Sequence, residues 1–391
     1  MADVAAVDAD LSSHTPPNPR VPDVQHEDSV FDVSTRYIIQ QVVGRGAFGY
    51  VMAAECNVTG KRVAIKKVKN ATADRVGALR LLREISFLRH LRGHPNVICV
   101  QDVIVRQHNS QVDVYLVTEL MEADLEQIIK SSQYLSNEHI QYLSFQMLAG
   151  LQHLHDQTII HRDLKPSNLV VDSFCRLKIC DLGLSRHICE SANVPAGEDA
   201  LFTDYVVTRW YRAPELLLGS RRYCCSVDIW AAGCILAELM VRRPVFTGND
   251  PSDMLLRIAG AIRPPSASDM SSLEHQPGVS HGARLYLHSL PRRPLNQPEL
   301  EELVGRQPDD PGLNLLLGLL RWNTSARLSV QSALAHPYLS SYHGQATLPP
   351  APSPDLQLLP ILIESESLAA LQERIVGEAH WWSSHSKSTN L

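Results

Sequence analysis

The run His161-Arg162-Asp163-Leu164-Lys165-Pro166-Ser167-Asn168 places a carboxylate, an ammonium group and an amide within one short stretch. Asp163 can accept the proton of a hydroxyl group, and Lys165 can neutralise charge on a phosphoryl group in transfer. Asn168 offers a hard oxygen ligand for Mg²⁺, and the downstream Asp181-Leu182-Gly183 offers a second in Asp181. This spacing predicts phosphoryl transfer and disfavours the alternative, a charged loop without a ligand.

Farther along, Thr203-Asp204-Tyr205 places two phosphorylatable hydroxyl groups one residue apart, shortly before Ala213-Pro214-Glu215. Each phosphate would bring about two negative charges to this segment. The pair therefore predicts a switch that works by double phosphorylation.

Upstream, a glycine-rich run lies between two predicted strands: Gly44-Arg45-Gly46-Ala47-Phe48-Gly49-Tyr50-Val51. Glycines let backbone amides approach phosphate oxygens that a Cβ atom would keep away. Alone, the run fits a glycine-rich hairpin turn equally well. A dinucleotide-binding fold is disfavoured, because a strand rather than a helix follows the glycines.

A lysine follows in Val63-Ala64-Ile65-Lys66, again in a predicted strand. Lys66 can reach the α- and β-phosphates of a nucleotide, but it needs a carboxylate to hold it, and Glu84 on the next predicted helix is the candidate. The alternative is an ordinary ion pair on a helix surface. The order of glycine loop, lysine strand and glutamate helix favours the nucleotide site.

The apolar pattern changes along the chain. Between Val76 and Leu91, apolar residues recur at helical spacing, and helical stripes dominate after Met121. A last helix is expected at Leu368–Ala379. Short β-branched runs predict antiparallel strands at residues 37–43, 51–56, 63–68, 97–105 and 112–117. The pattern therefore predicts an α+β protein, with a β-rich lobe followed by a larger helical lobe.

Together these motifs resemble those of the eukaryotic protein kinases, and the Thr-x-Tyr pair resembles that of the MAP kinases. The resemblance covers about residues 31–339 and the last helix. It implies a two-lobed kinase fold with an ATP cleft between the lobes. The expected parts are a flexible tail at residues 1–30, a kinase domain at 37–339 (N-lobe 37–118, hinge 119–123, C-lobe 124–339), and a C-terminal extension at 340–391 whose helix packs on the N-lobe.

The resemblance also implies where ATP and Mg²⁺ bind. The backbone of Glu119 and Met121 would bond the adenine, Val51 and Ala64 would enclose its ring, and Asp124 would lie near the ribose. The full set of nucleotide contacts is Val43, Gly44, Arg45, Gly46, Ala47, Phe48, Gly49, Tyr50, Val51, Ala64, Lys66, Thr118, Glu119, Met121, Asp124 and Asp181. Asn168 and Asp181 would hold Mg²⁺, and catalytic roles fall on Lys66, Glu84, Asp163, Lys165, Asn168 and Thr208. The resemblance further implies that Asp228 braces the catalytic run and that Arg327 pairs with Glu215.

The switch implied by the resemblance needs cations around each phosphate. For Thr203 these are Arg83, Arg162 and Arg186, which would tie the small lobe, the catalytic run and the segment after Asp181 together. For Tyr205 they are Arg209 and Arg212. The implied partners are an upstream dual-specificity MAP kinase kinase, phosphatases and protein substrates.

Substrate choice follows from Arg212. In related kinases this position turns a backbone carbonyl away from the substrate, so the residue after the acceptor Ser/Thr lacks a partner for its N–H group. Proline has no N–H group to leave unpaired. We therefore expect Ser/Thr-Pro substrates.

Three positions depart from the family pattern. Leu182 stands where phenylalanine is usual, and Pro251-Ser252 stands where a docking pocket often has an aromatic and an aliphatic residue. After Leu339, where the family usually has an acidic docking cluster, residues 340–347 contain no carboxylate. Docking of partners through that cluster is therefore not expected.

Composition excludes several other classes. The chain has 391 residues and a formal net charge of −6, which argues against a bulk nucleic-acid binder. No apolar run approaches the ~20 residues of a membrane helix, and the acidic start does not resemble a secretory signal. The eight cysteines lack Cys-x-x-Cys spacing. We expect a monomer with reduced thiols in the cytoplasm and the nucleus, binding neither nucleic acid nor membrane.

Two alternatives remain open. One is a neighbouring kinase group, cyclin-dependent-like or germ-cell-associated, some members of which also carry Thr-Asp-Tyr. The other is a catalytically silent scaffold. The hinge run Met121-Glu122-Ala123-Asp124-Leu125 and the last helix favour a MAP kinase over the first. The presence of every residue needed for phosphoryl transfer disfavours the second.

Overall fold

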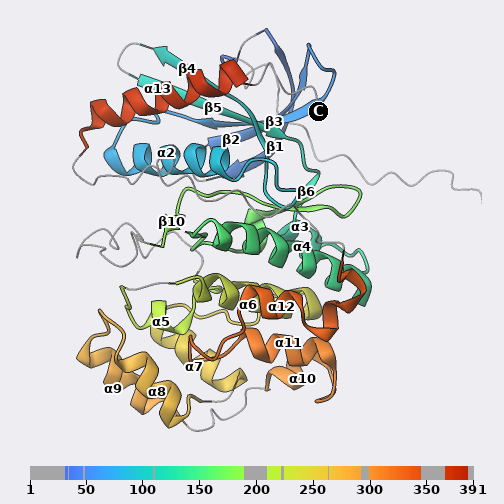
Figure 1. Cartoon of the computed structure of the whole chain (residues 1–391), viewed down its shortest axis with the longest axis vertical. Helices are drawn as coiled ribbons and strands as arrows, with labels where there is room; N and C mark the ends of the chain where they lie inside the picture. The colour runs from blue at the N-terminus through green and yellow to red at the C-terminus, as the bar shows by residue number, and fades with distance from the viewer. Residues whose placement is uncertain are drawn as a thin grey trace, which may run out of the picture.

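The computed structural model describes residues 31–33, 35–46, 49–108, 111–188, 209–221, 224–262, 264–291, 299–344 and 366–385. These residues form a smaller lobe built on one sheet and a larger helical lobe, as Figure 1 shows. The two-lobed α+β architecture expected from the sequence is therefore confirmed. The predicted tail at residues 1–30 and the residues Thr203, Tyr205 and Thr208 lie outside the described residues.

The sheet of the small lobe has five antiparallel strands in the order β1-β2-β3-β5-β4. They are β1 (Tyr37–Gly46), β2 (Gly49–Cys56), β3 (Arg62–Val68), β4 (Val100–His108) and β5 (Gln111–Glu119). Lys66 of β3 pairs with Val51 of β2 on one side and with Leu116 of β5 on the other. This register fixes Lys66 beside the strand that leaves the glycine-rich turn.

Strand β4 begins later than the sequence predicts. The expected strand at residues 97–105 is instead Val100–His108. The preceding residues have another partner: Val97 forms a parallel bridge with Ile179, Ile98 N donates to Ile179 O, and Ile179 N donates to Asn96 O. A β-branched run thus serves two sheets, which the apolar pattern alone does not reveal.

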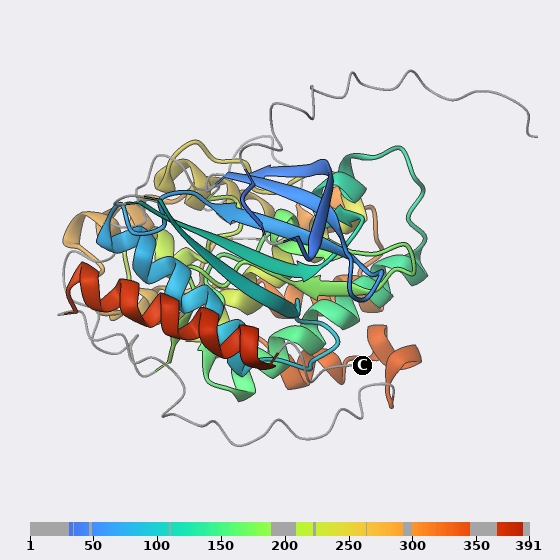
Figure 2. The same ribbon diagram turned by 90° about the horizontal axis from the view of Figure 1, so that it is seen from above.

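Two helices cover one side of the small lobe. Helix α2 (Arg75–His90) begins at Asp74, whose carboxylate accepts from the Gly77 amide at 2.8 Å. Helix α13 (Leu368–His385) lies beside α2 and β4, as Figures 1 and 2 agree. It extends beyond the predicted end at Ala379, because Trp382 continues its buried stripe.

The large lobe is built around helix α6 (Ser226–Val241), which is buried almost all round. Its Gly233 admits close packing, since a Cβ atom there would lie 2.8 Å from Leu320 Cδ2. The surrounding helices are α3 (Leu125–Lys130), α4 (Asn137–Asp156), α5 (Pro214–Leu217), α7 (Pro251–Ala261), α8 (Ala267–Glu274), α9 (His281–Ser289), α10 (Leu300–Val304), α11 (Pro311–Leu319) and α12 (Val330–Leu334). Among the described residues, no helix is both long and apolar enough to cross a membrane.

Short strands line the junction of the two lobes. Strands β6 (Ala123–Asp124), β8 (Leu169–Val171) and β9 (Leu177–Ile179) form one small sheet. Strands β7 (Ile159–Ile160) and β10 (Arg186–His187) form a second. The catalytic run starts directly after β7 and ends in the 3-10 turn η1 (Pro166–Asn168), directly before β8. The two small sheets thus fix both ends of that run.

Candidate active site

The predicted pairing of Lys66 with Glu84 is present. Lys66 Nζ lies 2.7 Å from Glu84 Oε1 and 3.0 Å from Oε2. Burial alone would lower the pKa of Lys66, but the carboxylates of Glu84 and Asp181 raise it above its ordinary value. The side chain therefore carries its positive charge, which contact with a phosphate group requires.

The catalytic run converges on Asp163. Lys165 Nζ lies 2.7 Å from Asp163 Oδ2. Asn168 Nδ2 donates to the Asp163 carbonyl at 2.8 Å and to its carboxylate at 3.3 Å. Arg162, just before Asp163, has a φ of +69°, a left-handed conformation that is rare for a long side chain. A carboxylate, an ammonium group and an amide are thus held in mutual contact.

The backbone of this run is braced by Asp228 of α6, as the sequence predicts. Asp228 Oδ2 accepts from His161 N at 2.9 Å, and Oδ1 accepts from Arg162 N at 2.8 Å. Burial would raise the pKa of Asp228, but these hydrogen bonds and His155 hold it below its ordinary value. The brace is therefore an ionised carboxylate with two backbone donors.

His155 is a functional residue that the sequence did not reveal. Its Nε2 lies 2.9 Å from Asp228 Oδ2 at the end of α4. Burial would lower the pKa of His155, but the contacts with Asp228 and Cys225 raise it to about 9. A buried imidazolium thus supports the brace. His155 directly follows Leu154, the last residue of an apolar stripe. A histidine at such a position is ordinarily just a polar residue near the end of a helix.

Asn168 and Asp181 fit the Mg²⁺ site expected of them. Burial would raise the pKa of Asp181, but Lys66, His161 and Lys165 lower it, so the carboxylate is ionised. The side-chain nitrogen of Asn168 donates a hydrogen bond to Asp163, so the Oδ1 of Asn168 points away from Asp163. Mg²⁺ in phosphoryl-transfer enzymes is usually bound by one or two such protein oxygens together with substrate phosphates.

Neighbours of Asp181 have supporting roles. Burial raises the pKa of the Cys180 thiol, which favours the neutral core side chain over a reactive one. Leu182 is completely buried, in the apolar cluster that also contains Leu79 and Leu88 of α2. The leucine therefore fills an apolar site beneath α2, in the place where phenylalanine is usual.

The proposed adenine contacts lie on β2, on β3, at the end of β5 and in the segment just after β5. Val51, Ala64, Thr118, Glu119 and Met121 are all half-buried. Val43 and Tyr50 are more exposed, and Gly44 is half-buried. Arg45, Gly46 and Gly49 are placed through the backbone of β1 and β2, whereas Ala47 and Phe48 lie outside the described residues.

Asp124, expected near the ribose, begins helix α3. Its Oδ1 accepts from Gln127 N at 2.8 Å, and its Oδ2 accepts from Gln127 Nε2 at 2.6 Å. The carboxylate is thus the N-cap of α3. Contact with a ribose stays a prediction.

The three arginines expected around phosphorylated Thr203 are buried and come from three elements. Arg83 lies on α2 beside Glu84, Arg162 lies in the catalytic run, and Arg186 lies on β10. Arg186 pairs with Ile160, so β10 and β7 bring it close to the catalytic run. Buried guanidinium groups in such positions favour an anionic partner.

The arginines expected around Tyr205 lie in the segment before α5. Arg209 donates to Asn249 O at 3.2 Å, and Arg212 N donates to Arg209 O at 3.0 Å. Between them, Tyr211 donates to Glu238 of α6 at 2.7 Å, a contact that the sequence did not reveal. The predicted pair of Glu215 with Arg327 is confirmed, at 2.9 and 3.1 Å and almost fully buried.

Comparison with known proteins agrees with this geometry. The sequence model of the family "Protein kinase domain" matches residues 37–339. Three relatives illustrate the match. The first is "Mitogen-activated protein kinase homolog NTF3" of Nicotiana tabacum, 46% identical over 313 residues and 80% of each chain. The second is "Mitogen-activated protein kinase 7" of Arabidopsis thaliana, 40% identical over 354 residues and 90% of each chain.

The third relative is "Extracellular signal-regulated kinase 1" of Dictyostelium discoideum, 42% identical over 325 residues. This match covers 82% of the present chain and 58% of the relative. The family match and these relatives span most of the chain. The chain therefore belongs to the eukaryotic protein kinases and, within them, to the MAP kinases, as an ATP-dependent serine/threonine kinase.

Proposed function

We propose that this kinase transfers the γ-phosphoryl group of ATP to serine or threonine residues followed by proline, in a signalling cascade. The observation that carries the proposal is the convergence of Lys165 and Asn168 on Asp163, beside the formed Lys66–Glu84 pair. Phosphoryl transfer relies mainly on positioning and electrostatic stabilisation, which is what this group of residues can supply.

In the proposed step, the acceptor hydroxyl lies against Asp163. Its oxygen bonds to the γ-phosphorus while the bond from that phosphorus to the β–γ bridging oxygen breaks, and ADP leaves. The hydroxyl proton passes to the Asp163 carboxylate. Lys165 lies close enough to Asp163, at 2.7 Å, to neutralise charge on the transferred group. Mg²⁺, held by Asn168 and Asp181, would neutralise charge on the phosphates.

We further propose that an upstream dual-specificity kinase activates the enzyme by phosphorylating Thr203 and Tyr205, and that phosphatases reverse this step. The positions of Arg83 on α2, Arg162 in the catalytic run and Arg186 on β10 support the proposal, because guanidinium groups bind phosphate strongly. We propose a monomer that acts in the cytoplasm and the nucleus.

The experiment combines site mapping with peptide kinetics. The full-length protein is incubated with an activating kinase, and its phosphosites and activity are followed together. Activity should rise only with both phosphates in place, and Thr203→Val or Tyr205→Phe should prevent the rise. Activity that rises while neither residue is modified would show the switch to be wrong.

Peptide choice tests the proline preference separately. Replacing proline by alanine after the acceptor should lower kcat/KM about 5- to 100-fold, the cost of one buried N–H group without a partner. Equal kcat/KM for the two peptides would exclude the proline preference without excluding the kinase activity.

A further inference from the structure

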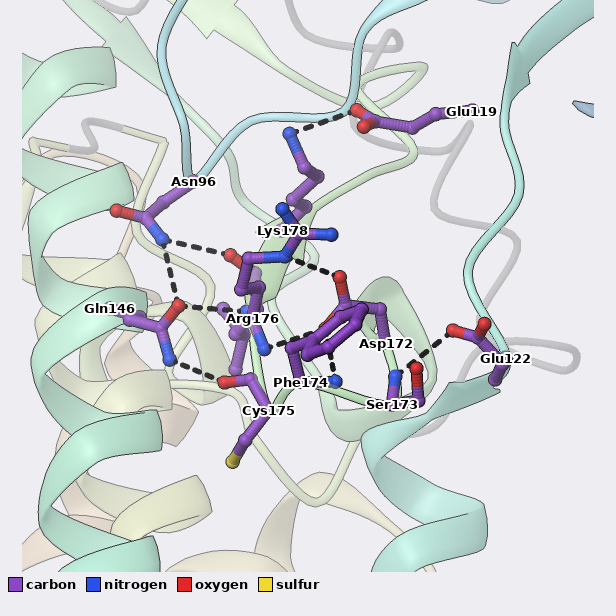
Figure 3. A network of polar contacts seen from close by, with 11 residues as sticks. Asn96, Glu119, Glu122, Gln146, Asp172, Ser173, Phe174, Cys175, Arg176 and Lys178 are labelled. Carbon is purple, nitrogen blue, oxygen red and sulfur yellow. Dashed lines mark hydrogen bonds and ion pairs between the residues drawn. The ribbon is translucent and has the colours of Figure 1, made fainter. Parts of the chain in front are cut away.

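Glu119 is the first residue of the hinge, and its side chain extends toward strand β9. Figure 3 shows its carboxylate facing Lys178 of β9, and the Nζ–Oε1 distance is 2.9 Å. The same oxygen accepts from the backbone N–H of Cys99 at 3.0 Å. The side chains of Lys178 and Glu119 are 15% and 29% exposed, so solvent screens this pair only partly.

Glu122 makes a second attachment to the same hairpin. Its Oε2 accepts from Ser173 N at 3.1 Å, in the turn between β8 and β9. Glu119 and Glu122 stand on either side of Met121, whose backbone is a proposed adenine contact. The hinge is thus fastened to the β8–β9 hairpin at both ends of its adenine-binding edge.

The hairpin is itself held by the large lobe and by the segment before β4. Gln146 of α4 donates to Cys175 O at 2.8 Å and accepts from Leu177 N at 2.9 Å. Asn96 donates to Leu177 O at 2.9 Å. These contacts join α4 and the segment before β4 to the β8–β9 hairpin. Figure 3 shows Gln146 turned toward Cys175. A hairpin fixed in this way can serve as a rigid support for the hinge.

The same hairpin leads into the proposed Mg²⁺ ligand. Only Ile179 and Cys180 separate Lys178 from Asp181. The Lys178–Glu119 pair therefore links the edge that would bind adenine to the strand that leads into the carboxylate expected to bind the metal. A nucleotide that contacts both the hinge and the metal at Asp181 would bind less well if these two parts moved relative to each other.

We propose that Lys178 is a positioning residue for the nucleotide, acting through Glu119 to hold the hinge against the β8–β9 hairpin. The inference rests on the proposed nucleotide site and adds a specific role to a residue outside it. Without the Lys178 ammonium group, the Glu119 carboxylate keeps the Cys99 amide but loses the other of these two partners. The hinge should then move more, and bound nucleotide should leave faster.

The test compares Lys178→Met with Arg176→Met in the full-length protein. Arg176 is the matched control: it lies on the same hairpin and also forms an ion pair, with Asp172, but its side chain is 63% exposed. The probe is a fluorescent ADP analogue, whose dissociation is followed by stopped flow. KM values for ATP and for a Ser-Pro peptide, and the Tm, are measured on the same samples.

Lys178→Met should release the analogue about 2- to 5-fold faster and raise KM for ATP similarly, the size expected for a partly screened ion pair. KM for the peptide should not change, Arg176→Met should match the wild type, and Lys178→Arg should restore slow release. If Lys178→Met does not fold, the release rate is measured on Lys178→Gln, which keeps a neutral hydrogen-bond donor.

Two results would overturn the inference. One is an unchanged release rate in both Lys178→Met and Lys178→Gln. The other is an equal rise of KM for ATP and for the peptide, which would indicate a general structural defect. Failure of the wild type to bind the analogue would instead contradict the proposed nucleotide site, and the inference with it.

Discussion

Helix α2 has two unlike faces. The face toward β3, here named the cleft face after the nucleotide cleft expected between the lobes, carries Glu84, which binds Lys66 at 2.7 Å. The opposite face carries Ser86 and Arg89, both bonded to Glu378 of α13, and the Arg89 guanidinium lies 3.9 Å from the centre of the Trp381 ring. Beneath these contacts, Trp382 is buried in the apolar cluster shared by the two helices.

The difference between these faces separates chemistry from stability. On the cleft face, two charges are placed for a ligand, so a change there should act mainly on turnover. On the outer face, apolar side chains are removed from water, so a change there should act mainly on the free energy of unfolding. Three substitutions test this separation, and a fourth tests the protonation of a histidine just beyond the end of α2.

The largest effect is expected for Trp382→Ala. This side chain is 1% exposed, and its truncation should lower the free energy of unfolding by about 3–5 kcal/mol. Trp382→Phe should cost much less, because the ring packing is partly kept. Chemical denaturation gives the stabilities, and turnover is measured where each variant is folded. A loss of turnover without a loss of stability would contradict the separation.

Next in size is Lys66→Met, at the cleft face. Removing the cation should lower kcat/KM about 10²- to 10³-fold, as for other preorganised charges at a reacting phosphoryl group. The free energy of unfolding should fall by only about 1–3 kcal/mol, because Glu84, left without its partner, can take up a proton. A Lys66→Met protein that is active but barely stable would reverse the roles of the two faces.

A smaller effect is expected just beyond the end of α2, where His94 stacks on His153 of α4 with ring centres 4.4 Å apart. Burial, with His153 and Lys178 nearby, lowers the pKa of His94 to about 3. Below about pH 6.5, His94 therefore binds a proton in the unfolded chain but not in the folded protein. The free energy of unfolding thus falls as the pH drops from about 6.5 toward 3.

The measurement for His94 compares the wild type with His94→Gln, whose side chain does not titrate. Relative to this variant, the wild type should lose up to about 1.4 kcal/mol of unfolding free energy per pH unit below about pH 6.5. Urea unfolding at several pH values gives the slopes. Parallel curves for the two proteins would show that His94 takes up its proton equally well when folded.

The smallest effect is expected for Glu378→Gln on the outer face. Its pair with Arg89 is partly exposed, so the loss should be about 0.2–1 kcal/mol with turnover unchanged. Glu373, exposed on the same helix, is the control, and Glu373→Gln should leave stability where it was. A large loss of turnover in Glu378→Gln would mean that the outer face takes part in positioning Glu84.

The sequence predicts those contacts that motifs define. Lys66 with Glu84, Asp228 with the catalytic run, and Glu215 with Arg327 each join residues in recognisable patterns, and the structure places each pair in contact. His155 and Lys178 belong to no such pattern. Their roles arise only when α4 packs against α6 and β9 against the hinge, so nothing local to them in the sequence indicates those partners.

Element boundaries were missed for a similar reason. The start of β4 at Val100 depends on the bridge between Val97 and Ile179, which are far apart in sequence. The end of α13 depends on Trp382 finding cover in the small lobe. Apolar spacing shows that a residue seeks burial, but not which distant element buries it.

In the proposed reaction Asp163, which contacts Lys165 and Asn168, accepts the proton of the substrate hydroxyl group. The most direct measurement is phosphate transfer to a Ser-Pro peptide by the doubly phosphorylated protein and by Asp163→Asn prepared in the same way. Asp163→Asn should lower kcat about 10²- to 10⁴-fold with little change in nucleotide affinity. Equal turnover by the two proteins would show that Asp163 does not have this role.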